Sequence, residues 1–305
     1  MDHLASLSLF IRIVEKGGLA SAGRDFGLSP AAVTERLASL EKHYNARLLN
    51  RTTRAISLTD EGRVLFEGAR NLLSEATDLE SRIRHGVAQL SGPIRLSAPI
   101  DLGRNRVAPL VDQFIEHHPE ISVELCLSDG YIDLVAQGID LALRFGSLKD
   151  SSLHSKKIGT NRRILCASPA YLARHPAPVH PDDLSEHNCL LMRFGMTTDR
   201  EWPFVIDGKV KNYSVRGNRI ANDGALVKHW CLLGHGLALK SQWDVELHLN
   251  KGELIPLLEN FSAPENTLQI IYPGGKTLPK RVRTMIDFLA RELDRGPGRS
   301  KQPFA

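Results

Sequence analysis

Several features that would indicate an exported, membrane-spanning or metal-binding protein are missing from this chain of 305 residues. The first residues, Met1-Asp2-His3, do not form the basic start of a secretory signal. No run approaches the roughly 18 apolar residues that a membrane-spanning helix needs. The four cysteines are scattered and form no Cys-x-x-Cys pair, so zinc-ligand spacing is missing as well. These absences predict a cytoplasmic protein with no metal, no other cofactor and no membrane partner.

The polar residues give little support for an enzyme. The 12 histidines show neither metal-ligand spacing nor a nucleophile beside them. Gly234-His235-Gly236 lacks the further glycine or lysine-serine of a phosphate-binding loop. We therefore expect no catalytic residues.

Two interpretations of the cysteines stay open, namely packing as small hydrophobic side chains or a redox-sensing pair among them.

The composition is that of an ordinary globular protein. Hydrophobic residues make up 42% and charged residues 24% of the chain, which is long enough for two or more domains with sizeable cores. A net charge of +4 is mildly basic and compatible with binding to nucleic acid.

The most informative stretch is residues 17–54, where two short helices are joined by a glycine turn and followed by basic residues. Helical spacing of apolar residues predicts a helix over residues 3–15 and a short one over about 20–26. Ser29 caps the next helix, and Pro30 fits its first position, where a missing N–H does no harm. Its inner face comprises Ala32, Val33, Leu37 and Leu40. Its outer side comprises Ala31, Thr34, Glu35 and Ala38.

This order of elements predicts a helix-turn-helix, with a generic helical bundle as the alternative. Arg47 and Arg51-Thr52-Thr53-Arg54 come next and precede the strand-like residues 55–58. A basic hairpin at this place would form a wing whose arginines contact phosphates or a narrow minor groove. A solvated run of charge is the other interpretation.

A long helix is predicted from about Asp60 to Arg84. Its apolar residues are spaced 4, 3, 4, 3 and 4 apart, which is a heptad seam. The seam consists of Leu65, Ala69, Leu72, Ala76, Leu79 and Ile83. So narrow a stripe suits pairing with a second copy of the chain, although packing against its own C-terminal half is the alternative. A dimer would present two reading helices to a two-fold-symmetric DNA site.

The remaining residues predict two α/β lobes after a hinge over residues 86–92. Strands at 94–98, 121–127 and 141–145 alternate with helices at 107–115 and 131–137, which favours a parallel sheet covered on both faces. A second lobe begins near Arg163, with Ser168 as a helix cap and Asp207-Gly208 as a hairpin turn. The strand at 268–272 and the helix at 279–293 return to the first lobe. We expect lobe I over about 93–162 and 269–295, and lobe II over about 163–268.

Ligands of open α/β sheets bind outside the carboxyl ends of the strands. That rule selects four loops. The predicted effector-binding residues are Pro99, Ile100, Asp101, Ser128, Asp129, Gly130, Phe145, Gly146, Asn222, Asp223 and Gly224. Backbone N–H groups at helix starts, such as those after Asp101 and Asp223, favour anions.

The chain resembles the LysR-type transcriptional regulators from end to end. The resemblance is carried by Phe10-Ile11-Arg12-Ile13-Val14-Glu15, Leu28-Ser29-Pro30-Ala31-Ala32-Val33-Thr34, Leu40-Glu41, and the run from Leu48 through Arg54 to Gly62. Arg200-Glu201-Trp202-Pro203-Phe204 and Leu239–Asp244 are similar to a subgroup that includes D-malate-responsive regulators.

The resemblance implies an α/β protein in which an N-terminal all-α winged helix-turn-helix (1–60) and a dimerisation helix (61–85) precede a two-lobe domain like periplasmic binding proteins (93–305). It places Ser29, Pro30, Ala31, Thr34 and Glu35 in the DNA groove, with Arg51, Thr53 and Arg54 in the wing. The implied partners are double-stranded promoter DNA, a small-molecule effector such as a small carboxylate, a homodimer or homotetramer, and RNA polymerase when the regulator activates. A solute receptor and a nucleoid-type DNA binder are the rival classes, each of which would leave one half of the chain without use.

Some positions depart from the family pattern. Pro30 and Glu35 stand where the family often has Gln and Arg or Lys, so its operator preferences do not carry over. Asp101 stands where Ser or Thr is common. It is either the cap of the following helix or a cleft carboxylate paired with Arg104, Arg106 or Arg144.

Overall fold

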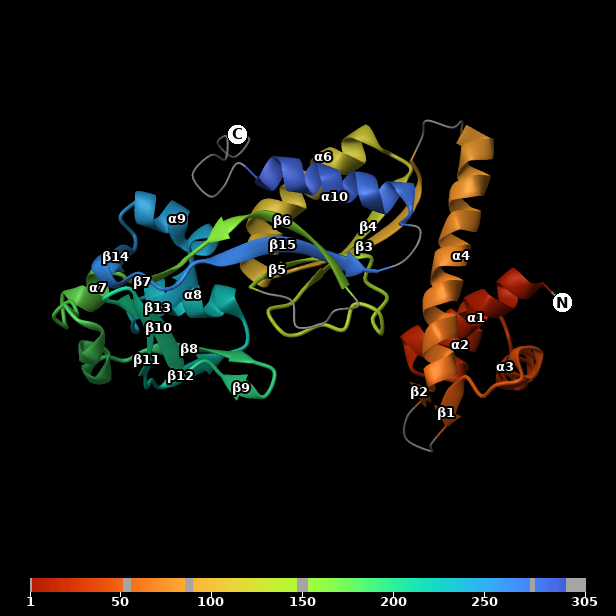
Figure 1. Cartoon of the computed structure of the whole chain (residues 1–305), viewed down its shortest axis with the longest axis horizontal. Coiled ribbons are helices and arrows are strands. Elements are labelled where there is room, and N and C mark those ends of the chain that lie inside the picture. Colours follow the sequence, from red (N-terminus) through yellow and green to blue (C-terminus); the bar gives the residue numbers. More distant parts are fainter. Residues whose placement is uncertain (1, 52–55, 86–89, 147–152, 275–277, 295–305) are drawn as a thin grey trace.

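The computed structural model describes residues 2–51, 56–85, 90–146, 153–274 and 278–294. The chain forms an N-terminal helical module, one long helix and two α/β lobes, and lobe I lies between the long helix and lobe II (Figure 1). Within the described residues no helix has both the length and the apolar character that crossing a bilayer requires.

The N-terminal module is built from three helices and a two-stranded hairpin. Its elements are α1 (His3–Lys16), α2 (Leu19–Asp25), α3 (Pro30–Tyr44), β1 (Leu49–Arg51) and β2 (Ile56–Leu58). Gly17 ends α1 in the left-handed conformation, with φ of 61°. Ser29 caps α3 as predicted, because its hydroxyl accepts a hydrogen bond from the backbone N–H of Ala32 at 3.2 Å. Phe10 and Phe66 meet edge to face in the core, with ring centroids 6.5 Å apart.

Helix α4 (Asp60–His85) starts against the hairpin. A Cβ at Gly62 would collide with the carbonyl oxygen of Leu48, so only glycine allows this close approach. The predicted heptad seam is divided in two. Leu65 and Ala69 pack into the core of the N-terminal module, against which Val135 of lobe I also packs. Leu72, Leu79 and Ile83 remain exposed and free to meet a partner.

Lobe I is a five-stranded sheet in the order β4-β3-β5-β15-β6. The bounds are β3 (Gly92–Ala98), β4 (Ile121–Leu127), β5 (Leu141–Phe145), β6 (Leu153–Asn161) and β15 (Asn266–Pro273). β3 pairs in parallel with β4 and β5, whereas β15 runs antiparallel to β5 and β6. The parallel pairing predicted for the strands at 94–98, 121–127 and 141–145 is therefore confirmed, and the sheet is extended by two antiparallel strands. α6 (Ala108–His117) and α10 (Lys280–Leu293) lie together over the sheet (Figure 1).

Lobe II consists of three small sheets, β12-β8-β9, β13-β7-β14 and β10-β11. The strands are β7 (Arg163–Ala167), β8 (Leu190–Phe194), β9 (Thr197–Thr198), β10 (Glu201–Ile206), β11 (Lys209–Ser214), β12 (Arg219–Ala221), β13 (Ala238–Ser241) and β14 (Ile255–Leu257). The helices are α7 (Pro169–Leu172), α8 (Gly224–Leu232) and α9 (Gln242–Asn250). Trp202 and Phe204 are its largest fully buried side chains.

One predicted turn is confirmed, and one predicted helix is wrong. Asp207 and Gly208 connect β10 to β11 with φ of 51° and 74°, which confirms the hairpin turn. The helix predicted over Tyr131–Gln137 is wrong, because this segment makes only a single turn. That turn ends at Gly138, whose φ is 69°.

Two smaller predictions concern the cap at Ser168 and the hinge over residues 86–92. Ser168 stands at the N-cap of α7, but its hydroxyl makes no capping hydrogen bond. Most of the predicted hinge over 86–92 lies outside the described residues, and its last residue, Gly92, already belongs to β3.

The four cysteines are free thiols, and three of them are buried, which favours the packing interpretation. Burial raises the pKa of Cys189 to about 12.

Candidate DNA-binding surface and ligand cleft

Helix α3 presents a polar outer side above an apolar inner side. Val33, Leu37 and Leu40 are buried in the module core, as their spacing predicted. The residues assigned to the DNA groove are all exposed, namely Ser29, Pro30, Ala31, Thr34 and Glu35. The Thr34 hydroxyl donates to the carbonyl oxygen of Pro30 at 2.9 Å, while its methyl group remains available to a base. The apolar side of α3 is therefore held in the module core, and its polar side is exposed to solvent.

The basic segment forms the predicted hairpin beside α3. β1 and β2 pair antiparallel, with Leu49 opposite Leu58 and Arg51 opposite Ile56. Thr53 and Arg54, which were assigned to the wing, lie outside the described residues. Exposed Arg47 precedes the hairpin, and its carbonyl oxygen accepts a hydrogen bond from the Thr59 hydroxyl. This arrangement has the order of parts found in winged helix-turn-helix domains.

A cavity of about 500 Å³ lies between the two lobes. Residues from both lobes line it, at the carboxyl ends of β3, β4 and β5. Six of the predicted effector-binding residues line this cavity, namely Pro99, Ser128, Asp129, Gly130, Phe145 and Gly224. The other five do not, namely Ile100, Asp101, Gly146, Asn222 and Asp223. The rule of strand ends thus located the cleft but not its whole lining.

Two of the five residues that do not line the cavity, Asp223 and Gly146, make hydrogen bonds within the protein instead. The carboxylate of Asp223 caps α8, because it accepts hydrogen bonds from the N–H groups of Ala225 at 2.8 Å and Leu226 at 3.1 Å. The carbonyl oxygen of Gly146 accepts a hydrogen bond from the side-chain amide of Gln269 at 2.6 Å. Asn222 is exposed to solvent.

Both interpretations of Asp101 were wrong. The cap of the short helix α5 (Ile100–Leu102) is Pro99, and Asp101 lies inside the helix with only 4% of its surface exposed. Its carboxylate pairs with lysines of lobe II and not with arginines, at 2.6 Å from Nζ of Lys228 and 3.4 Å from Nζ of Lys240. These pairs join the two lobes. A buried carboxylate needs such partners because burial of an unpaired charge is costly.

Lys240 is the centre of this buried network. Its Nζ lies 3.1 Å from the carboxylate of Asp244 and donates to the carbonyl oxygen of Gly224 at 3.0 Å. Burial acts to lower the pKa of Lys240, but the charges of Asp244 and Asp101 outweigh it, so the pKa is raised. The ammonium group therefore stays charged inside the cleft wall.

Asp129 bridges the lobes at the base of the cleft. Its Oδ1 accepts from the N–H of Ile100 at 2.9 Å in lobe I, and its Oδ2 accepts from the N–H of Gly224 at 2.7 Å in lobe II. These N–H groups stand at the starts of α5 and α8, and that of Gly224 is one of the groups after Asp223 that we expected to favour an anion. The protein places its own carboxylate there.

Sequence reasoning missed part of the cleft. Arg144 was considered only as a partner for Asp101, but it lines the cavity and donates to the Ser97 hydroxyl at 2.9 Å. Burial lowers the pKa of Arg144 to about 10, with the charge of Asp129 acting in the opposite direction. Apart from Pro99 and Phe145, the apolar lining was missed, and it includes Ile132, Leu134, Leu153, Met192, Phe194, Leu239 and Ile271. Phe194 is the last residue of β8, so the rule of strand ends applied to that strand could have found it.

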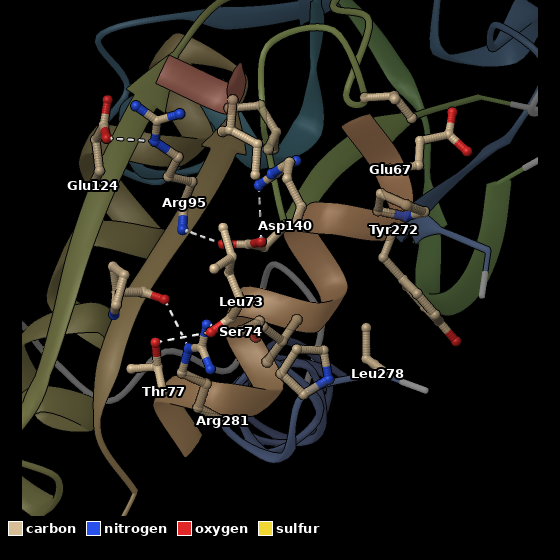
Figure 2. Close-up of a pocket in the computed structure, with 18 of the residues that line it drawn as sticks. Glu67, Leu73, Ser74, Thr77, Arg95, Glu124, Asp140, Tyr272, Leu278 and Arg281 are labelled. Atoms are coloured by element: carbon tan, nitrogen blue, oxygen red, sulfur yellow. Dashed lines mark hydrogen bonds and ion pairs between the residues drawn. The ribbon is translucent and has the colours of Figure 1, made fainter. Parts of the chain in front are cut away.

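A second cavity, of about 650 Å³, lies where α1 and α4 meet lobe I (Figure 2). Arg95 on β3 lines it and makes two ion pairs. The guanidinium lies 2.8 Å from a carboxylate oxygen of Glu15 on α1 and 2.8 Å from one of Glu124 on β4. Arg95 thus links lobe I to the DNA-binding module.

Two further links strengthen this junction. Arg70 on α4 lies 3.3 Å from the carboxylate of Asp140, which also accepts from the backbone N–H of Arg95 at 2.8 Å. Burial raises the pKa of Asp140, although that N–H and the surrounding arginines act against the rise. Arg281 on α10 donates to the Ser74 hydroxyl of α4 at 2.9 Å (Figure 2). The junction therefore connects α4 to both the sheet and a covering helix of lobe I.

An exposed helix beside a β-hairpin, joined to a two-lobe domain with a cavity between the lobes, defines a DNA-binding protein with a ligand-binding domain. The sequence comparisons give the class its name. Residues 4–63 match the bacterial regulatory helix-turn-helix protein family of LysR type, and residues 88–294 match the LysR substrate binding domain. The chain belongs to the LysR family of transcriptional regulators, and it is a regulator and not an enzyme.

The relatives match over nearly their whole length. The chain is 32% identical over 292 residues to the HTH-type transcriptional regulator DmlR of Escherichia coli (strain K12), covering 94% of this chain and 93% of DmlR. The structure of CrgA from Neisseria meningitidis superposes with a TM-score of 0.62 at 31% identity, covering 95% and 98% of the two chains. The full-length Vibrio cholerae virulence activator AphB gives 0.61 at 32% identity, covering 94% and 98%. Regulators of this family bind promoter DNA and small-molecule effectors and form oligomers.

Proposed function

We propose that the chain binds promoter DNA as a dimer or a dimer of dimers, and that a small carboxylate in the interlobe cleft changes this binding or the activation that follows. The observation that supports the proposal best is the presence of an exposed α3 and an interlobe cavity in one chain, connected by the ionic junction around Arg95. A ligand that favours one arrangement of the lobes can shift the population of DNA-binding states through such a connection.

The DNA half of the proposal assigns the reading of bases to α3 and the holding of the backbone to the wing. Ser29, Thr34 and Glu35 offer polar groups to the major groove, while Pro30 and Ala31 offer only apolar contact. Arg51, Thr53 and Arg54 would contact phosphates. Affinity for DNA should then fall steeply as the salt concentration rises.

The oligomeric half depends on α4. Its exposed apolar residues Leu72, Leu79 and Ile83 follow a seven-residue repeat in part and would pair with the same helix of a second copy. A pair of chains would place two α3 helices on successive turns of the duplex. In an activating arrangement the bound oligomer would contact RNA polymerase, in the cytoplasm where transcription takes place.

The test of the DNA half is a binding titration of the full chain against fragments of its own promoter region, with footprinting to locate the site. Replacing Arg51 and Arg54 together by Ala should weaken binding at least about tenfold and lower the slope of log affinity against log salt by about one for each phosphate that the variant no longer binds. The matched control replaces Lys209 and Lys211, two exposed lysines of β11 in lobe II, by Ala. Equal affinity of both double variants would remove the wing assignment.

The test of the ligand half is the same footprint in the presence of small carboxylates. A ligand that acts through the cleft should change the length or position of the protected region, and it should raise the melting temperature of the free protein by mass action. A footprint that no carboxylate alters would remove the proposed class of effector.

A further inference from the structure

The N–H groups that would receive a ligand carboxylate at the helix starts are already occupied. Both oxygens of Asp129 are used, one by the N–H of Ile100 and the other by the N–H of Gly224. A ligand anion at this place would meet the charge of Asp129 at contact distance, with the carboxylate of Asp244 in the same cavity wall. The base of the cleft is therefore closed to a ligand acid group.

The cations of the cleft leave one place for an anion. Of the three that line the cavity within the described parts of the chain, Arg163 pairs with Asp199 at 2.6 Å and Lys240 with Asp244 at 3.1 Å. Arg144 has no carboxylate within 4.0 Å among those residues. Its guanidinium donates to two neutral oxygens, the carbonyl of Leu143 at 2.7 Å and the Ser97 hydroxyl at 2.9 Å. A guanidinium carries five N–H donors, so others remain for a ligand.

The rest of the cleft is apolar and larger than a four-carbon acid would need. The volume of about 500 Å³ falls within the range of roughly 300–1,000 Å³ typical of sites for drug-sized ligands. Phe145 and Met192 line it from the two lobes. Tyr131 and Phe194 also line it but are exposed, so they stand at its opening, again one from each lobe. Aromatic rings on both sides of an opening suit a flat apolar group between them.

We propose that the effector carries a single carboxylate and an apolar, preferably aromatic body. The acid group binds Arg144, and the body packs against Phe145 and Met192 with Tyr131 and Phe194 closing over it. Dicarboxylates bind poorly, because their second acid group finds Asp129 and paired cations. This inference depends on the proposed role of the cleft as the effector site, and it narrows the class of carboxylate.

The experiment is calorimetric titration of the full chain with benzoate, phenylacetate, 3-phenylpropionate and indole-3-acetate. Succinate supplies a second acid group in place of the apolar body, and 2-phenylethanol supplies the body of phenylacetate without the acid. We expect at least one aromatic acid to bind at least about tenfold more tightly than both comparison compounds, since a charge-assisted hydrogen bond has about that effect. Succinate as the tightest ligand, or no binding by any of the four acids, would overturn the inference.

Substitutions test the assigned anchor. Arg144→Gln should weaken the best aromatic acid at least about tenfold, and Arg144→Lys should restore part of the affinity, because it keeps the charge. The matched control is Arg104→Gln, an exposed arginine outside the cavity lining. Asp129→Asn should make succinate bind more tightly by removing the charge at the cleft base. Unchanged affinity of the Arg144→Gln protein for the aromatic acid would also overturn the inference.

Failure of this inference can be told apart from failure of the proposed function. DNA binding is measured on the same preparations. A protein that binds promoter DNA and responds to succinate but to no aromatic acid keeps the proposed function and refutes the single-acid class. A protein that binds an aromatic acid through Arg144 but does not bind DNA specifically supports the inference and refutes the proposed function.

Discussion

The ionic junction makes a quantitative prediction for the substitution Glu15→Gln. This change removes the carboxylate that lies 2.8 Å from the guanidinium of Arg95 and joins α1 to lobe I. The two side chains are 16% and 27% exposed, so solvent screens the pair only in part. Fully exposed pairs contribute about 0.2–1 kcal/mol and charge-assisted hydrogen bonds about 1.5–3 kcal/mol. We expect the stability of the docked N-terminal module to fall by about 1–2 kcal/mol.

The assay follows from the positions of the chromophores. None of the three tryptophans lies in the N-terminal module or in α4, because Trp202 and Trp230 pack in lobe II and Trp243 packs in the core of lobe I. Tryptophan fluorescence therefore follows the unfolding of the two lobes in urea, whereas circular dichroism follows the helices of the whole chain. In the Glu15→Gln protein the helical signal should disappear at a lower urea concentration, with the fluorescence midpoint unchanged.

The control and the refuting outcome come from a double-mutant cycle. Glu124 also lies 2.8 Å from Arg95 but is 58% exposed and belongs to lobe I, so Glu124→Gln should change stability by less than about 0.5 kcal/mol. Combining Glu15→Gln with Arg95→Gln should destabilise the protein by less than the sum of the two single effects. Additive effects, within about 0.3–0.5 kcal/mol, would show that the two residues do not interact across the junction and would refute the reasoning.

Three more predictions concern lobe II. Lys240→Met leaves Asp244 without its buried cation and should lower the free energy of unfolding in urea by about 3–5 kcal/mol; a decrease below about 1 kcal/mol would contradict the buried network. Asp223→Ala removes the cap of α8 and should cost about 1 kcal/mol, measured in the same way, and an unchanged stability would contradict the capping role. Burial lowers the pKa of His187 in the folded state, so the unfolded chain binds the extra proton first and stability falls as the pH drops through about 6.5. In the His187→Asn protein the urea midpoint should change less between pH 7 and pH 5 than in the unsubstituted protein. An equal change of the midpoint in both proteins would contradict this.

The sequence patterns predicted correctly those structural features that depend on residues close together in the chain. The spacing of Val33, Leu37 and Leu40 indicated the inner side of α3, and Ser29 with Pro30 indicated its start, because caps and helical faces depend on residues within one or two turns. Asp207-Gly208 indicated the hairpin for the same reason. The helix expected over residues 131–137 failed because apolar spacing cannot tell a single turn from a continuing helix.

Long-range partners were beyond the sequence patterns. Asp101 meets Lys228 and Lys240, which lie more than a hundred residues away and in the other lobe, so capping rules and nearby arginines misled its interpretation. The strand-end rule chose the loop of Asp129 but could not foresee that its carboxylate would fill the helix starts. The sequence did not single out Arg144 as a lining residue of the cleft, because it does not show which of the other cations there are paired with carboxylates.

Strand β5 of lobe I runs from the junction with the DNA-binding module to the interlobe cleft. Asp140, at the junction, directly precedes β5, and Arg144, in the cleft, lies four residues later on it, roughly 13 Å away at about 3.3 Å per residue. So short a stretch of buried, hydrogen-bonded backbone transmits force with little bending. If the proposed function is right, we expect genetic screens for altered inducibility to recover substitutions such as Leu143→Ala, because Leu143 is buried on β5 and lines neither of the two cavities.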